Sequence, residues 1–529
     1  MNKVSLSSDP LIFPHLYMDL NGVGQPLLSA AVGAAPRQHS VNSSTASFTA
    51  DENDIKPINS PRDFFREFYV ETKKLWCLAG PAIFMSLCQY SLGAVTQLFA
   101  GHVSTIALAA VAVENSIIAG FSMGAMLGMG CALETLCGQA FGAGRIDMLG
   151  VYMQRSWIIL NCTAILLMFL YIFAAPFLKL IGQDAEIAEA AGTLAIYMIP
   201  QLFAYAFNFP MAKFLQAQSK MMAMAVISGI VLVIHTSLSW LLMIKLGWGL
   251  VGAAVALNSS WFLIVVSQMA YILSGTCGRA WSGFSWGAFR NLWGFVRLSL
   301  ASAVMLCLEI WYYMALILFA GYLKNAEIAV DALSICMNIV GWAVMLAMGL
   351  NAAISVRVSN ELGAARPRTA KFSVVVVALE STVIGLVISL ALILTRNDYP
   401  SLFTESHEVQ SLVDKLTPIL AVCIIINNLQ PILSGVAIGA GWQAFVAYVN
   451  IACYYLFGMP MGLILGYKLG LGVQGIWTGM ISGTFVQTII LLLMIYKTNW
   501  NKEAATATDR IKKWGGEVAD HPQPRDIES

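Results

Sequence analysis

Long apolar segments separated by short polar ones dominate the chain between residues 76 and 497. Most of these segments exceed the roughly 20 residues that an α-helix needs to cross the hydrocarbon core of a bilayer. The pattern therefore predicts an all-α polytopic membrane protein with about twelve spans. We expect them near 76–100, 104–137, 150–180, 186–212, 221–245, 250–274, 293–322, 328–359, 370–395, 410–437, 443–468 and 473–497.

The remaining segments are polar. Those at the two ends have the composition of disordered tails. Phe and basic residues are interspersed in the segment ahead of the first span, which is typical of an interfacial helix, although a frayed start to that span is the alternative. The predicted parts are an N-terminal tail (1–60), an interfacial helix (61–75), a first lobe (76–274), a linker (275–292), a second lobe (293–497) and a C-terminal tail (498–529).

Composition supports the bilayer as the solvent. Only 11% of the 529 residues are charged, and 58% are hydrophobic, whereas a soluble domain carries about 25% charged residues. The net charge of +1 gives no indication of a nucleic-acid partner. Lys and Arg are concentrated in alternate loops, for example at Arg145, Lys220 and Arg366. The positive-inside rule places these loops, the linker and both termini in the cytoplasm, in agreement with an even number of spans.

The first half of the chain repeats in the second half at an offset of 221 residues. Gly142 corresponds to Gly363, Arg145 to Arg366 and Pro210 to Pro431 at this offset. The KLGxGxxG motif at 245–252 recurs at 468–475. Six spans per half would give the two lobes the same orientation, so we expect a pseudo-symmetric pair with a cleft between them. Rocking of such lobes would open a central site to each side of the membrane in turn.

Signatures of enzymes are absent from the sequence: it has no HExxH, GxSxG or P-loop motif. We therefore predict that the protein is not an enzyme and binds no cofactor or metal. Its energy would come from an ion gradient or from the substrate's own gradient. The ten cysteines include no CxxC pair, and we interpret them as small packing residues.

Carboxylates deep within apolar segments are the strongest candidates for function, because a charge in the bilayer centre is costly. We predict that Glu309 binds and releases a proton, since burial disfavours its charged form. Glu114 is predicted either to line a substrate cavity or to be a structural partner. We interpret Glu134 and Glu380 as structural, and His235 as a hydrogen-bonded residue between helices.

Other polar and aromatic residues could line the cleft. We predict a substrate cavity that also includes Asn208, Trp311, Tyr312, Asn427 and Gln430. Prolines at matching places in the two halves interrupt helical hydrogen bonds, and could bend the lobes or free carbonyls. These predicted bending points are Pro200, Pro210, Pro418 and Pro431.

Four segments resemble the plant branch of the multidrug and toxic compound extrusion (MATE) family. They are MLGMGCALETLCGQAFGAG (126–144), CLEIW (307–311), SVRVSNELGA (355–364) and LQPILSGVAIGAGWQ (429–443). The resemblance covers roughly residues 70–497. It implies the MATE fold of two six-helix lobes and cation-coupled antiport, which is usually proton-coupled in plants.

Two positions depart from the pattern of many eukaryotic members. Met314 stands where they carry a second Glu, and Asn427 where they carry an Asp. The second lobe therefore has fewer negative charges than in relatives that bind strongly cationic substrates. This resembles the branch associated with flavonoid glycosides and other vacuolar solutes, some of whose members resemble anion-conducting proteins.

The leading hypothesis is therefore a monomeric secondary transporter that exports organic solutes in exchange for protons, with xenobiotic detoxification as a related role. An anion channel or carrier on the same scaffold is the alternative. Lipid flipping would require several basic residues inside the membrane, which the sequence lacks. Gln25-Pro26-Leu27-Leu28 resembles a dileucine sorting signal, which favours the vacuolar membrane over the plasma membrane.

Overall fold

The structure, a computed structural model, describes residues 54–290, 292–320 and 326–514. In this part of the chain the regular structure is helical, and 12 helical segments are long and apolar enough to cross a membrane. They follow the predicted segments in order, so the predicted all-α polytopic fold is confirmed. The dileucine-like motif lies outside the described residues.

The first lobe (N-lobe, residues 61–276) begins with the longest helix, α2, whose start is capped by the Ser60 hydroxyl. Its predicted third span is broken at Phe173, because Pro176 has no N–H to donate to the carbonyl of Ile172. The N-lobe elements are α2 (Pro61–Val103), α3 (Thr105–Val113), η1 (Glu114–Ala119), α4 (Gly120–Gly142), α5 (Met148–Ile172), α6 (Ala174–Leu180), α7 (Ala185–Ala217), α8 (Met221–Ser239), η2 (Trp240–Lys245), α9 (Gly249–Tyr271) and η3 (Ile272–Thr276).

The second lobe (C-lobe, residues 292–497) follows a linker with two short 3₁₀ helices. The linker and C-lobe elements are η4 (Gly278–Ala280), η5 (Trp286–Phe289), α10 (Leu292–Ala320), α11 (Ala326–Gly363), α12 (Pro367–Leu394), η6 (Tyr399–Leu402), α13 (His407–Ala440), α14 (Gln443–Asn450), η7 (Ile451–Gly458), α15 (Met459–Leu463), η8 (Ile464–Lys468) and α16 (Gly472–Lys497). One more helix, α17 (Trp500–Trp514), follows the C-lobe.

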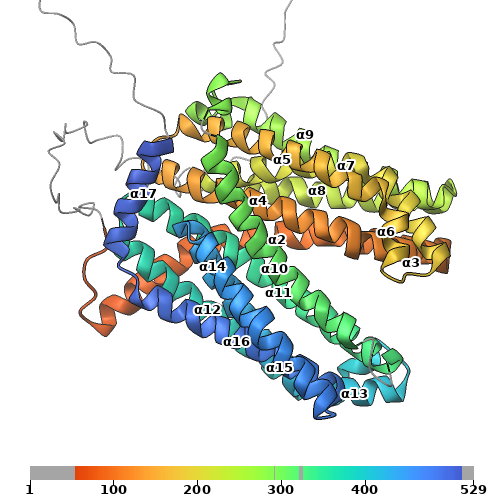
Figure 1. Ribbon diagram of the computed structural model, residues 1–529. Helices are drawn as coiled ribbons and strands as arrows, with labels where there is room; N and C mark the ends of the chain where they lie inside the picture. Colours follow the sequence, from red (N-terminus) through yellow and green to blue (C-terminus); the bar gives the residue numbers. More distant parts are fainter. Residues whose placement is uncertain (1–53, 291, 321–325, 515–529) are drawn as a thin grey trace, which may run out of the picture.

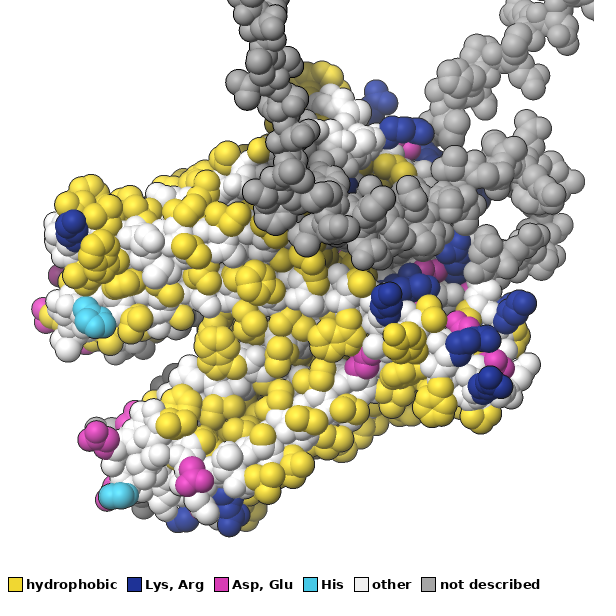
Figure 2. Space-filling model, turned by 180° about the vertical axis from the view of Figure 1, so that it is seen from behind, with side chains coloured by type: hydrophobic (Ala, Val, Ile, Leu, Met, Phe, Trp, Pro, Cys, Tyr) yellow, Lys and Arg dark blue, Asp and Glu magenta, His cyan; other side chains and the backbone are white. Residues whose placement is uncertain are grey.

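The two lobes form the arms of a V (Figure 1). They meet at a closed end, where α4 and α11 cross at Gly142 and Gly363, and diverge toward an open end. A space-filling view shows the cleft between the arms, widest at the open end (Figure 2). One cluster of buried apolar residues continues from N-lobe Leu133 and Phe214 to C-lobe Ile438, whereas a second is confined to the C-lobe. The lobes thus share a core at the closed end.

Three predicted boundaries differ from the structure. Residues 61–75 are not a separate helix but continue into the first span within α2. The N-terminal segment is already fixed at Asp54, whose carboxylate accepts from the Thr369 backbone N–H at 2.9 Å. The prediction that 498–529 is disordered from its start is wrong, since α17 packs on α4, α11 and α12. Its buried residues Trp500, Ala504, Ala507 and Ile511 recur every three or four positions and form one apolar face.

Candidate transport site

Glu309 on α10 is held by three neutral donors. The Gln430 amide donates to its Oε1 at 2.9 Å, and the Ser434 hydroxyl and the Asn450 amide donate to the same oxygen at 3.3 Å. Gln430 and Ser434 lie one turn apart on α13, and Asn450 ends α14. The carboxylate therefore joins three helices of the C-lobe, and its hydrogen-bond partners among the described residues are all uncharged.

Asn450 is itself fixed by further hydrogen bonds. Its amide also donates to the carbonyl of Met305 at 3.2 Å, and its Oδ1 accepts from the Gln487 amide at 2.8 Å. The Tyr454 hydroxyl donates to Gln487 Oε1 at 2.9 Å. This chain of neutral groups points the amide N–H of Asn450 at Glu309.

The sequence did not predict most of the hydrogen-bond network around Glu309. Only Glu309 and Gln430 were among the predicted site residues. Ser434 has a detectable signal, because it stands four residues after Gln430 and so shares its helix face. Asn450 and Gln487 are single amides in apolar segments, and sequence spacing does not show that they meet.

Asn427, one turn before Gln430, also belongs to this part of the C-lobe. Its Oδ1 accepts from the Tyr313 hydroxyl at 2.5 Å, and its amide donates to the sulfur of Cys423 at 3.0 Å. Tyr313 follows Glu309 by one turn of α10, so the two helices α10 and α13 are joined twice.

The two aromatic residues predicted for the cavity point in different directions. Tyr312 is fully buried within the C-lobe, where its ring stacks on Tyr454 at 4.3 Å and its hydroxyl donates to the carbonyl of Met480 at 2.6 Å. It is therefore shielded from the cleft. Trp311 is 41% exposed and stacks on Phe121 of α4, with ring centroids 5.5 Å apart and planes 5° from parallel. Trp311 is therefore a contact between the lobes.

Met314 lies on the same face of α10 as Trp311, and its terminal methyl is 3.8 Å from the position of a Cβ built on Gly120. Gly120 begins α4 of the N-lobe. Met314 is thus an apolar side chain of the C-lobe that faces the N-lobe.

The predicted N-lobe residues do not join the Glu309 network. Glu114 begins η1 and is 2% exposed, and Asn208 on α7 is 1% exposed. Among the described residues, neither Glu114 Oε1 nor Asn208 Oδ1 has a hydrogen-bond partner. They are buried polar groups inside the N-lobe rather than residues on an open surface.

The four predicted prolines do not interrupt their helices, since α7 and α13 each run through both of theirs. Three of the four nevertheless have a carbonyl in the preceding turn that is bound by a neighbouring helix, as expected where a proline loosens the helical ladder. These bonds run from Asn258 to Tyr197 O (before Pro200), from Trp157 to Phe207 O (before Pro210) and from Ser381 to Asn428 O (before Pro431). No such bond precedes Pro418 in the described part of the chain.

Two further buried groups are paired. Glu134 forms an ion pair with Lys213 at 2.6 Å inside the N-lobe. His235 is fully buried, and its two ring nitrogens lie 2.9 Å from Ser260 Oγ and 3.1 Å from Thr96 Oγ1. Both match the structural interpretation made from the sequence.

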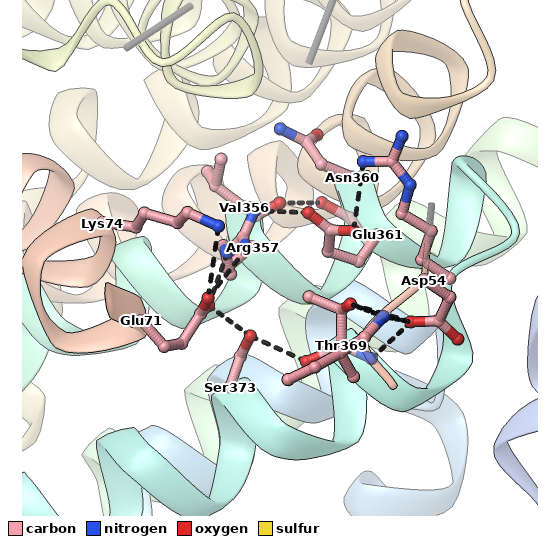
Figure 3. A network of polar contacts seen from close by, with 12 residues as sticks. Asp54, Glu71, Lys74, Val356, Arg357, Asn360, Glu361, Thr369 and Ser373 are labelled. Atoms are coloured by element: carbon pink, nitrogen blue, oxygen red, sulfur yellow. Dashed lines mark hydrogen bonds and ion pairs between the residues drawn. The ribbon is translucent and has the colours of Figure 1, made fainter. Parts of the chain in front are cut away.

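At the closed end, an ionic network ties α2 to the C-lobe (Figure 3). Arg357 of α11 donates to both oxygens of Glu71 of α2, at 2.6 and 3.0 Å, and to the carboxylate of Glu361 one turn later. The Ser373 hydroxyl of α12 also donates to Glu71 at 2.5 Å. The first span of the N-lobe is therefore anchored on the C-lobe.

Comparison with known proteins agrees with this architecture. The MatE family profile matches residues 81–241 and 301–464, one segment in each lobe. Protein DETOXIFICATION 31 of Arabidopsis thaliana is 64% identical over 98% of this chain and 99% of its own length. Protein DETOXIFICATION 30 of the same organism is 69% identical over 88% of this chain and 94% of its own length.

Solved structures show the same arrangement. The crystal structure of the eukaryotic MATE transporter AtDTX14 superposes with a TM-score of 0.80 and 36% identity, over 84% of this chain and 99% of that one. The bent form of the Vibrio cholerae transporter VcmN has a TM-score of 0.72 at 17% identity over 85% of this chain and 99% of that one, and so shares the fold.

Fold and comparisons together define an integral multi-pass membrane protein of the transporter class. The chain belongs to the MatE family, whose members are transporters of small organic compounds rather than enzymes.

Proposed function

We propose that this protein exports organic solutes from the cytoplasm in exchange for protons, by alternating access between its two lobes. The observation that carries the proposal is the setting of Glu309, whose carboxylate has three neutral hydrogen-bond donors from α13 and α14. A carboxylate held in this way can exchange a proton without breaking an ion pair.

Protonation of Glu309 would change the hydrogen bonding of the whole site. An ionised carboxylate only accepts, whereas a protonated one also donates. The amides of Gln430 and Asn450 would then have to turn or withdraw, and Asn450 is coupled to Gln487 and Tyr454. The proton would thereby alter how α10 is joined to α13 and α14.

The charges support an orientation with the open end facing away from the cytoplasm. Lys and Arg gather near the closed end, whereas His, Asp and Glu are conspicuous at the open tips (Figure 2). By the positive-inside rule the closed end, with Arg366 and Arg368, is cytoplasmic. Protons from an acidic compartment would then reach Glu309 through the open cleft. We infer the vacuolar membrane, with the plasma membrane as the other location.

The substrate class follows from the neutral surface of the site. Trp311 and Met314 are exposed and uncharged, and the amides of Asn427 and Gln430 lie buried behind them beside Glu309. This combination suits glycosylated aromatic solutes such as flavonoid glycosides better than strong cations. A substrate-contact role for Glu114 and Asn208 stays a prediction.

The proton gradient would be the energy source, with no cofactor. For one-for-one electroneutral exchange each pH unit supplies about 1.4 kcal/mol, or tenfold accumulation. A monomer would suffice, because both lobes belong to one chain.

The test is uptake of a flavonoid glycoside into vesicles that contain the purified protein, with an imposed pH gradient. Uptake should follow the gradient and be lost in Glu309→Gln, while Glu380→Gln serves as the matched control because Glu380 is a half-buried carboxylate of another helix. Full pH-driven uptake by Glu309→Gln would refute the proton role. Anion currents far above carrier turnover, indifferent to pH and to Glu309, would refute exchange altogether.

A further inference from the structure

Two amides cross between the lobes at the closed end. Gln139 of α4 donates to the carbonyl of Gly439 on α13 at 3.0 Å, and Asn360 of α11 donates to the carbonyl of Ala217 on α7 at 3.3 Å. Gln139 and Asn360 are 221 residues apart and so occupy equivalent places in the repeat. Each lobe thus reaches the other with the same kind of bond.

The two amides differ in what holds their oxygens. Gln139 Oε1 accepts from Arg510 of α17 at 2.9 Å, whereas Asn360 Oδ1 is buried without a partner among the described residues. A primary amide with a free oxygen can rotate, because its nitrogen and oxygen have similar shapes. Arg510 fixes the orientation in which the Gln139 N–H points at the other lobe.

Arg510 also binds the C-lobe directly. The same Nη1 atom donates to the carbonyl of Ala440, at the end of α13, at 3.2 Å. The next residue, Gly441, has a φ of 84°, and a Cβ added there would lie 2.7 Å from the guanidinium nitrogens. The glycine therefore makes room for Arg510 and ends α13 in the left-handed conformation. One guanidinium nitrogen bridges the N-lobe and the C-lobe.

Helix α17 places Arg510 through contacts of its own. Trp500 packs against Trp442 with ring centroids 6.0 Å apart, and the indole N–H of Trp442 donates to Glu503 at 3.0 Å. Ala504, Ala507 and other buried residues of the same face seat the helix on both lobes. In Figure 1, α17 crosses the closed end of the V.

We infer that α17 holds the two lobes together at the closed end. Arg510 is the positioning residue, and it favours the conformation that is open at the other end of the V. Opening of the closed end separates Gln139 from Gly439, and Arg510 must then release either Gln139 or Ala440. The inference rests on the proposed alternating access, but on neither the proton nor the substrate.

The test is hydrogen–deuterium exchange of the full-length protein in lipid nanodiscs, without substrate and at one pH. In Arg510→Ala, amides of residues 139–145 and 437–443 should exchange at least about tenfold faster, because the substitution removes two charge-assisted hydrogen bonds. Lys512→Ala, an exposed lysine of the same helix, is the control and should leave exchange unchanged. Unchanged exchange at the closed end of Arg510→Ala would contradict the inference that α17 holds the lobes together there.

A double variant separates positioning from simple docking of α17. If Arg510 acts through Gln139, Arg510→Ala combined with Gln139→Ala should exchange no faster than the faster single variant. If the rate increases of the two single variants multiply in the double variant, or if exchange is faster only within α17, then Arg510 serves only to dock α17 on the lobes. Because exchange needs neither uptake nor Glu309, its outcome is independent of the transport assay.

Discussion

The carboxylate of Glu71 and the guanidinium of Arg357 form a bidentate ion pair that joins the first helix of the N-lobe to the C-lobe, with distances of 2.6 and 3.0 Å. Both side chains are buried, and Arg357 also binds Glu361. The lobes of the V are therefore linked at the closed end by charge as well as by packing.

Arg357→Leu should strongly destabilise the protein, because it leaves Glu71 and Glu361 buried without their shared partner. Loss of one member of a buried pair costs about 3–5 kcal/mol. Thermal unfolding in nanodiscs measures the effect. Arg66→Ala, which removes an exposed partner of Asp63, is the control and should change stability by under about 1 kcal/mol. Equal midpoints for the two variants would contradict the prediction.

Gln487→Ala should impair transport without unfolding the protein. It frees the Asn450 amide to turn away from Glu309, and we expect an uptake rate lower by about tenfold, the size of one buried hydrogen bond. Thr488→Ala is the neighbouring control, since in the described part of the chain its hydroxyl donates only to the Thr484 carbonyl of its own helix. Uptake by Gln487→Ala at the rate of this control would argue against the network.

Ser381→Ala should lower stability by about 0.6 kcal/mol, and by no more than about 1.7 kcal/mol, which are typical values for hydrogen bonds between membrane helices. The Ser381 hydroxyl binds the carbonyl of Asn428 in the turn before Pro431. In a Pro431→Ala background, a more regular helix should reduce the loss. Chemical unfolding measures the loss of stability. If Ser381→Ala lowers stability equally in the wild-type protein and in Pro431→Ala, the hydrogen bond does not depend on the proline.

His235→Phe should reduce stability but leave the pH dependence of uptake unchanged. His235 joins α8 to Ser260 and Thr96, and its ring is fully buried. The measurement is uptake across a series of pH gradients, compared with the thermal midpoint. A shifted pH profile in a variant that remains folded would instead assign the histidine to proton transfer.

Gly142→Ala should destabilise the closed end by about 1–3 kcal/mol, the usual cost of overpacking. A Cβ at Gly142 would collide with the backbone carbonyl of Asn360, and would lie 3.0 Å from the backbone nitrogen of Ala364. Gly80→Ala is the matched control in α2, with nothing within 4 Å of the added Cβ, and should be neutral or stabilising by up to about 1 kcal/mol. A stabilised Gly142→Ala variant would rule out a tight crossing.

The order and type of the spans could be predicted because a bilayer imposes both length and polarity on each helix. Glu309 stands out in the sequence for a related reason, since a carboxylate far inside an apolar segment is costly, and its role in proton binding stays a prediction. Glu134 and His235 were correctly expected to have partners, but the sequence did not say that the partners are Lys213, Ser260 and Thr96.

The sequence by itself determined the elements of this protein: twelve apolar segments, their repeat and the carboxylate that stands out among them. Only the tertiary structure decided which amides surround Glu309, that Tyr312 is shielded from the cleft, and that α17 binds the closed end. These depend on the rotation of each helix and its register against neighbours that are distant in sequence. The spacing of Trp500, Ala504, Ala507 and Ile511 gives α17 an apolar face in the sequence, but only the tertiary structure shows that this face packs on both lobes.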